Sequence, residues 1–262
     1  MAIYHFSAKM ISRANGSSAL AAAAYRSASR LHDARLDWHH DFSNKAGVVH
    51  SEVLLPNGAP EHLSDRESLW NAVEAAELRK DAQLAREIEF ALPRELNQAE
   101  AIRLAREFVT DEFVSRGMIA DLNVHWDHGA DGEVKPHAHV MLTTREVAED
   151  GFGAKVRDWN RAELLTHWRE AWADHVNTRL AELDFDVRVD HRGRPHRGWP
   201  RRGLLPNGWS STPPLRARTA RSCSPGLRWR SMRSRTIKRP SPRVTWRCSC
   251  TGTARAKNNS IG

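Results

Sequence analysis

The chain has 262 residues, and its 40 Lys and Arg against 32 Asp and Glu give a formal net charge of +8, a length that suits one large domain or two small ones. Its longest apolar run, Ala19 to Ala24, is far shorter than the ~18 residues that span a bilayer, and the N-terminus lacks a charged-then-apolar leader. We therefore expect neither membrane insertion nor secretion, but a cytoplasmic protein.

The charge divides the chain into two segments. The last acidic residue is Asp190, so residues 1–192 have a net charge of −9, whereas residues 193–262 carry 17 Lys and Arg and no acid. The second segment also holds all the cysteines, which are Cys223, Cys248 and Cys250. Because the first segment has no thiol for a disulfide or a metal, we expect a disulfide-free domain there.

The basic tail at residues 193–262 also differs in composition. Gly, Pro, Arg and Ser are frequent, branched aliphatic residues are few, and neither a helical nor a strand period is visible. We expect disorder in this segment. Two interpretations stay open: a basic arm that binds nucleic acid, or translation in a shifted reading frame after about residue 192. The abruptness of the change favours the second, and no site residues are assigned to the tail.

Periodicity and capping residues divide the first 192 residues into strands and helices. In chain order, we predict a strand over 2–12, a helix over 17–30, a loop over 31–46, a strand over 48–55, a helix over 64–80, a strand over 86–92, a helix over 97–113, strands over 118–126 and 137–144, a helix over 160–183 and a strand over 187–190. A run of Ala favours the first helix, and a capping box from Ser64 to Glu67 favours the second.

The strands over 118–126 and 137–144 are joined by a Gly-rich loop, which is typical of a hairpin. A hairpin within the alternating pattern favours an α+β fold over a parallel α/β fold. We expect a two-layer sandwich with a mainly antiparallel central sheet and helices packed on one face. The opposite face would then be free for polar side chains.

Three of the fourteen histidines can meet at one point. His137 and His139 are two residues apart, so in a strand both imidazoles lie on one face, opposite Ala138 and Val140. His125, near the end of the preceding strand, comes opposite this pair if the two strands form a hairpin. Three imidazoles with open positions beside them suit a divalent Mg, Mn or Zn centre that still binds a substrate.

A pair of half-exposed strand histidines is the alternative to a metal site wherever a lone His-x-His pattern occurs. The position of His125 favours the metal site. His128, in the loop that follows, is a weaker rival ligand, and we expect it to face solvent.

Tyrosine is scarce, since the chain has only Tyr4 and Tyr25. Tyr4 falls in the first strand, where a structural role is the default. Tyr25 follows the run of Ala and precedes Arg26, with Arg30 one helical turn further on. Because guanidinium groups stabilise a phenolate and hold phosphate oxygens, Tyr25 is a candidate acceptor of a phosphoryl group. A tyrosine that anchors the helix to the sheet is the alternative, and the histidine cluster makes us favour the nucleophile.

Several segments resemble, in order, the MobA/MobL (MobQ-type) relaxase domain of mobilisable and conjugative plasmids, including TraA-like N-terminal nicking domains. The resemblance covers residues 1 to about 192, and the segments that carry it are AIYHFSAKMISRANGSSALAAAAYRSASR, REIEFALPREL, NVHWDHGADGEVKPHAHVMLTTR, RDWNRAELLTHWREAWADHVNTRL and VDHR.

The resemblance implies the HUH-endonuclease fold and nicking of one DNA strand at a plasmid origin of transfer through a 5′-phosphotyrosyl intermediate. It implies that Tyr25 is the nucleophile and that His125, His137 and His139 bind a divalent metal, with Mg or Mn expected. In its acidic motif, Glu87 or Glu89 would position or deprotonate the tyrosine or adjust the metal site, and a surface carboxylate is the alternative for either. Implied partners are single-stranded origin DNA, relaxosome accessory proteins and a type IV coupling protein.

A domain with a net charge of −9 needs locally placed cations to bind DNA, since affinity depends on neutralised phosphates. The candidates flank the nucleophile and the histidine strand, and they are Lys9, Arg13, Arg26, Arg30 and Arg157. We expect the acids of residues 61–81 and 95–112 to lie on a solvated back surface. Trp38, Trp126 and Trp159 could stack on unpaired bases, although tryptophan is more often packed inside.

Three other functions remain as alternatives. A rolling-circle replication initiator shares the chemistry, but its tyrosine usually follows the histidine motif, whereas Tyr25 precedes His137 here. A non-catalytic DNA-binding remnant is suggested by the frameshift, and the presence of the tyrosine and all three histidines argues against it. A small-molecule metal enzyme of the cupin kind would need more short strands than the sequence predicts.

Overall fold

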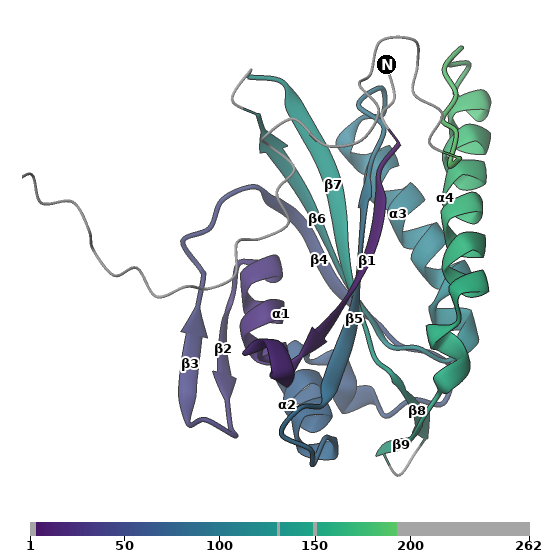
Figure 1. The fold of residues 1–262 in the computed structure, drawn as a ribbon. Coiled ribbons are helices and arrows are strands. Elements are labelled where there is room, and N and C mark those ends of the chain that lie inside the picture. Colours follow the sequence, from purple (N-terminus) through teal and green to yellow (C-terminus); the bar gives the residue numbers. More distant parts are fainter. Residues whose placement is uncertain (1–3, 130–131, 149–150, 193–262) are drawn as a thin grey trace, which may run out of the picture. The chain divides into compact units, whose positions relative to one another are not determined.

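A five-stranded antiparallel sheet forms the centre of the protein (Figure 1). The computed structural model describes residues 4–129, 132–148 and 151–192, so the expectations for the tail lie outside the described residues. The strand order is β1-β5-β7-β6-β4. The strands are β1 (Phe6–Ser12), β4 (Val48–Leu54), β5 (Gln83–Ala91), β6 (Ala120–His128) and β7 (Val134–Leu142).

In the described part of the chain, three of the four α-helices begin at a residue whose side chain caps the first turn; Arg161, before the fourth, makes no such bond, and the expected cap Asn160 lies in a 3-10 turn. The helices are α1 (Ala19–Ser27), α2 (Arg66–Ala76), α3 (Gln98–Glu112) and α4 (Ala162–Glu182). Ser18 caps α1, Asp65 caps α2 and Asn97 caps α3, each through a side-chain oxygen that accepts from a backbone N–H of the first turn. The expected cap Ser64 instead lies in a short 3-10 turn, and its hydroxyl donates to Glu61 O at 2.7 Å.

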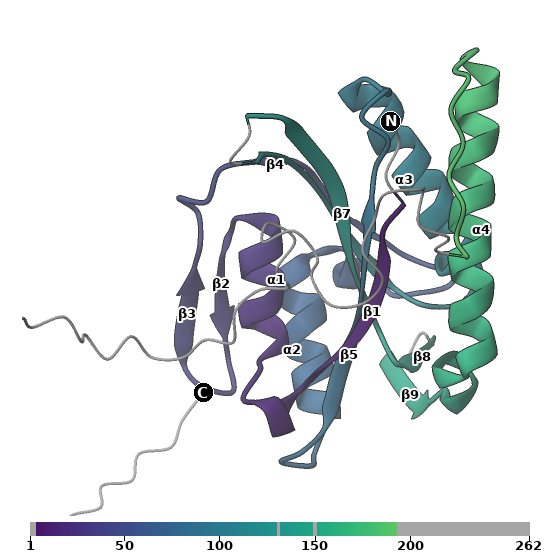
Figure 2. The ribbon, with the colours of Figure 1, turned by 45° about the horizontal axis from the view of Figure 1, so that its top comes forward.

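One face of the sheet is apolar and is covered by α3 and α4 (Figure 1, Figure 2). Because side chains alternate along a strand, Ile88 and Phe90 of β5 and Val140 of β7 point to this face together. They pack in one buried cluster with Phe108 of α3 and Trp172 of α4. This layer packs against the strands on the side opposite the polar face.

Helices α1 and α2 lie on the other side of the sheet, which corrects the expectation that all helices share one face (Figure 1, Figure 2). Leu20 of α1 and Trp70 of α2 form a second buried cluster with Met141 of β7. Met141 has the same strand parity as His137 and His139. The polar face is therefore partly covered, and the end of α1 reaches the histidines, where Arg26 O contacts His125.

The acids of α2 are not all on a solvated surface. Glu74 and Glu77, in and just after α2, are 3% and 6% exposed. Glu74 accepts from Arg13, and Glu77 accepts from Arg145 Nε at 2.8 Å. Packing α2 against the sheet buries these carboxylates, so each needs a guanidinium partner.

Two short hairpins were absent from the predicted elements. The segment 31–46, expected as a loop, contains β2 (Arg30–Asp33) paired with β3 (Trp38–Asp41). A second hairpin joins β8 (Arg145–Ala148) to β9 (Gly151–Lys155). Both have few apolar residues, so the sequence carries no clear strand period there.

The expected last strand over 187–190 is wrong, because this segment follows α4 without strand structure. Val189 is tied to α4 instead, by a pair of hydrogen bonds with the Asn177 side chain. In the described part of the chain, no helix has the length and apolar character needed to cross a membrane.

Candidate active site

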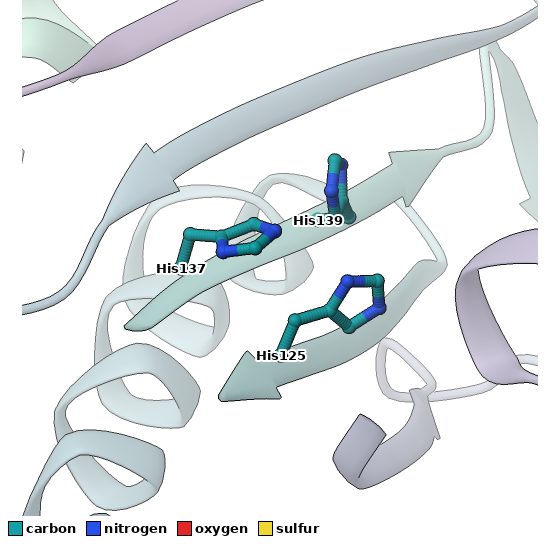
Figure 3. A group of neighbouring side chains, drawn as sticks. All are labelled: His125, His137 and His139. Atoms are coloured by element: carbon teal, nitrogen blue, oxygen red, sulfur yellow. The ribbon is translucent and has the colours of Figure 1, made fainter. Parts of the chain in front are cut away.

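Three histidines meet on the polar face of the sheet, as their spacing predicts (Figure 3). The register of β6 and β7 pairs His125 directly with His137, and His139 follows on the same face. Their ring centroids are 4.9 to 5.1 Å apart. One nitrogen from each ring can be chosen so that all three lie within 4.8 Å of one another. His128 is exposed and lies outside this group.

Hydrogen bonds fix the tautomer of each imidazole. The acceptors are Arg26 O for His125 Nε2 at 2.7 Å, Lys135 O for His137 Nδ1 at 2.9 Å and a Glu87 carboxylate oxygen for His139 Nδ1 at 2.9 Å. Since each of these acceptors requires an N–H, the other nitrogen of each neutral ring carries a lone pair. Those lone pairs are His125 Nδ1, His137 Nε2 and His139 Nε2.

Burial keeps two of these rings neutral. It lowers the pKa of His125 to about 2, with the neighbouring His139 and Lys45 adding to the effect. Burial, and then His139, also lower the pKa of His137. Neutral imidazole is the form that binds metal. The donor set therefore fits a divalent ion: three nitrogen ligands, oriented by carbonyl and carboxylate partners on their far sides.

Glu87 forms a hydrogen bond with one histidine of this group, His139. The Glu87 side chain is fully buried and also accepts from Arg26 Nε at 2.6 Å, while Lys9 Nζ lies 3.2 Å away. Burial alone would raise the pKa of Glu87, but His139 and Arg26 hold the pKa well below its usual range. The second candidate, Glu89, is opposite His139 in the β5–β7 register and lies 3.8 Å from His5 Nε2.

Tyr25 lies on the last turn of α1, at the helix end that contacts the histidines. The residue after it, Arg26, offers its backbone carbonyl to His125 at 2.7 Å. The Tyr25 ring is half-buried. It packs edge-on against Phe42 with centroids 5.3 Å apart, and Lys45 Nζ lies 4.2 Å from the ring centroid. The candidate nucleophile and the imidazoles thus share one face of the sheet.

The candidate DNA-binding cations do not form one group. Arg26 is 6% exposed and paired with Glu87, and Arg13 bonds Glu74 and nearby backbone carbonyls. These contacts support structural roles for both. Lys9 also pairs with Glu87 but is more open. Arg30, at the start of β2, and Arg157, after β9, are exposed.

The candidate stacking tryptophans also differ from one another. Trp38 is 64% exposed on β3. Trp126 and Trp159 are partly buried against the main apolar cluster, which is the packed alternative considered for them.

Sequence reasoning missed Lys45 as a neighbour of Tyr25. It lies in a polar segment between β3 and β4, where nothing in the spacing of residues indicates a contact. Only the folding of that segment back onto α1 brings the two together.

The sequence of this chain is similar to those of known proteins of one family. A family model described as the MobA/MobL family matches residues 17–207, extending past the change in composition at Arg192. The chain is 35% identical over 229 residues to the conjugal transfer protein TraA of Agrobacterium fabrum (strain C58), covering 76% of this chain and 20% of that protein. It is 36% identical over 228 residues to the mobilization protein MobL of Acidithiobacillus ferridurans, covering 76% and 60%. The chain thus spans about a fifth of the length of the TraA protein it matches.

A solved structure is also similar to this chain. It comes from work on the molecular basis of vancomycin resistance transfer in Staphylococcus aureus, is 41% identical, and aligns with a TM-score of 0.68 over 72% of this chain and 98% of that chain. The predicted α+β class with a mainly antiparallel sheet is confirmed.

Proposed function

The chain belongs to the MobA/MobL family, and from this premise we propose that it is a relaxase that nicks one strand of plasmid origin-of-transfer DNA. Tyr25 is the nucleophile, and the product is a 5′-phosphotyrosyl ester. The observation that carries the proposal is the hydrogen bond from His125 to Arg26 O at 2.7 Å. It joins the helix end that bears the phenol to a cluster of three imidazoles.

His125, His137 and His139 are the residues that would hold a divalent ion. When bound, such an ion supplies Lewis-acid chemistry, withdrawing electron density from a non-bridging oxygen of the scissile phosphate. Mn²⁺ and Mg²⁺ are the ions proposed. Glu87 contributes by orienting His139, because its carboxylate accepts a hydrogen bond from the Nδ1–H group and keeps the ring in one tautomer.

The reaction is a transesterification. The Tyr25 phenol oxygen attacks phosphorus, so that the bond from this oxygen to phosphorus forms and the bond from phosphorus to the 3′-oxygen breaks. The phenol proton passes to solvent, and the departing 3′-oxygen takes a proton from solvent. Because the phosphotyrosyl ester replaces a phosphodiester of similar energy, the strand can be rejoined without ATP. An ordinary phenol with a pKa near 10 is mostly protonated at neutral pH, so nearby positive charge assists the attack.

The first prediction concerns Tyr25. We expect Tyr25→Phe to abolish nicking and the covalent adduct while leaving DNA affinity nearly unchanged, because only the attacking oxygen is lost. The measurement uses the full chain with end-labelled single-stranded origin DNA and Mn²⁺, followed by denaturing electrophoresis for a protein-linked 5′ fragment.

Tyr4→Phe is the matched control for that experiment. Tyr4 donates its hydroxyl to Arg169 O at 2.8 Å, on the side of the sheet away from the histidines, so this variant should still form the adduct. Nicking at the wild-type rate by Tyr25→Phe would remove Tyr25 from the mechanism. Binding without cleavage by the unaltered chain would instead favour a non-catalytic DNA-binding protein.

A further inference from the structure

A short segment between β3 and β4 links the tyrosine helix to the histidine strand. Phe42 N donates to Ser29 O at 3.1 Å, just beyond α1, and Trp126 N, next to His125, donates to Gly47 O at 2.7 Å. Between these anchors, Lys45 N donates to Phe42 O at 2.9 Å and closes a turn. The segment 42–47 is therefore held at both ends, and its side chains have defined positions beside Tyr25.

Lys45 contacts Tyr25 in two ways. Its Nζ donates to the Tyr25 backbone carbonyl at 3.1 Å. The same atom lies 4.2 Å from the centroid of the phenol ring, within the range of a cation–π interaction. The carbonyl is one of the last in α1, where no further helical N–H is in line to bond it and where a positive charge is favourable. One ammonium group thus restrains both the backbone and the ring of the same residue.

The surroundings of Lys45 strengthen this contact. The side chain is half-buried, and burial lowers the pKa of Lys45, with Asp127 of β6 opposing the shift and Arg26 of α1 adding to it. A partly desolvated ammonium interacts more strongly with an aromatic face than an exposed one. Phe42 packs against the Tyr25 ring as well, with centroids 5.3 Å apart. The ring is therefore confined by one apolar neighbour and one cation.

We propose that Lys45 is a positioning residue for Tyr25, holding the phenol ring in place and setting a positive charge against its face, where it stabilises the negative charge that builds up on the attacking oxygen. The inference rests on the proposed role of Tyr25 as the nucleophile. Lys45 acts in two separable ways: its hydrogen bond fixes the end of α1, and its positive charge lies against the phenol ring.

The test compares Lys45→Met with Lys45→Arg in the full chain. Lys80→Met is the matched control, because Lys80 is exposed beyond the end of α2. Cleavage of labelled single-stranded origin DNA with Mn²⁺ gives the rate. In parallel, NMR of the carbon-13-labelled phenol carbon reports the surroundings of each tyrosine ring. With only two tyrosines in the chain, Tyr4→Phe identifies the Tyr25 signal.

We expect Lys45→Met to slow cleavage by about tenfold to a hundredfold, as misplacement of a reacting group does. The NMR signal of the Tyr25 ring should shift as well, because the cation against the ring face is gone. Lys45→Arg should restore most of the rate and the position of the signal, and Lys80→Met should match the unaltered chain. If Lys45→Met does not fold, Lys45→Gln, which removes the charge and keeps a donor, replaces it.

Two results would overturn the inference. One is a Lys45→Met variant whose cleavage rate and Tyr25 ring signal equal those of Lys80→Met. The other is slower cleavage that Lys45→Arg does not restore, which would leave only a structural contact. Failure of the proposed function is distinguishable, because it would appear as wild-type nicking by Tyr25→Phe, whereas the NMR signal reports on the contact between Lys45 and Tyr25 whatever the nucleophile is.

Discussion

At the scale of single residues, Glu87 connects the parts of the candidate site. Its carboxylate accepts from Arg26 of the tyrosine helix and from His139 of the imidazole cluster, with Lys9 of β1 at 3.2 Å. A buried carboxylate is costly unless it is paired, and so is a buried guanidinium. Glu87 and Arg26 therefore stabilise one another's burial, and the same contact aligns a candidate metal ligand.

The prediction for this residue is that Glu87→Gln weakens both metal binding and folding. Losing the carboxylate partner of a ligating histidine costs about tenfold to a hundredfold in metal affinity. Leaving the buried Arg26 without its counter-ion costs about 3–5 kcal/mol of unfolding free energy. Calorimetric Mn²⁺ titration and urea denaturation measure the two effects.

Glu89→Gln is the control for Glu87→Gln, because Glu89 lies on the same strand face but its ion pair with His5 is longer, at 3.8 Å. We expect a clearly smaller loss from it. Equal losses from the two substitutions would show that the Glu87 contacts contribute nothing specific.

At the scale of elements, the features that follow from local periodicity could be predicted from the sequence. The alternation of His137, Ala138 and His139 determined which face the imidazoles share, and the hairpin placed His125 opposite His137. Periodicity gives each helix an apolar stripe but does not say which face of the sheet receives it. For this reason the position of α2 and the burial of Glu74 were missed.

The contact between Lys45 and Tyr25 was beyond prediction for a related reason. It depends on the path of a polar segment without periodicity, and that path depends on backbone conformations. Gly47 has φ of +91°, and a Cβ there would lie 2.1 Å from Asp127 Oδ1. Such a requirement can be read from coordinates but not from a single sequence.

Gly47 supplies a prediction at this scale. Gly47→Ala should destabilise the fold by at least the ~1–2 kcal/mol that a left-handed conformation costs a residue with a Cβ. It should also slow nicking, because the strained backbone at a φ of +91° and the displaced Asp127 carboxylate disturb the segment that carries Lys45. Urea denaturation and the cleavage assay are the measurements.

Gly58→Ala is matched to that substitution, since Gly58 also has a positive φ, of +82°, but nothing lies within 4 Å of its hypothetical Cβ. Gly58→Ala should show only the loss of stability caused by the positive φ, and its nicking rate should be unchanged. Equal nicking rates of the two variants would show that the conformation of segment 42–47 does not affect nicking.

At the scale of the whole molecule, residues 1–192 combine a net charge of −9 with a site of buried ionisable groups. Glu87 is buried as an anion among cations, whereas His125 is buried as a neutral ring 1% exposed. Acidification lowers the free energy of unfolding through both groups, although Glu87 is charged and His125 is neutral in the folded protein. The stability of the fold is therefore coupled to the chemistry of the site.

The sign of this coupling follows from the pKa shifts. Burial lowers the pKa of His125 from 6.5 to about 2, so below about pH 6.5 the unfolded chain takes up a proton that the folded chain does not. Stability therefore falls as the pH drops, by up to ~1.4 kcal/mol per pH unit for each such histidine. The pKa of Glu87 is lowered from 4.5 by His139 and Arg26 against the effect of burial, so its contribution is present above that value and is lost on further acidification.

We accordingly predict a steady decline in unfolding free energy of the metal-free protein between about pH 7 and about pH 5, measured by urea denaturation at each pH. His125→Asn, which cannot titrate, should show a shallower slope, whereas substitution of the exposed His128 by Asn should leave the slope unchanged. Added Mn²⁺ should raise stability most near neutral pH, because it binds the deprotonated imidazoles of the folded state. Stability that is independent of pH across this window would mean that the imidazoles are not buried as neutral rings, which would remove the basis for a metal site built on their lone pairs.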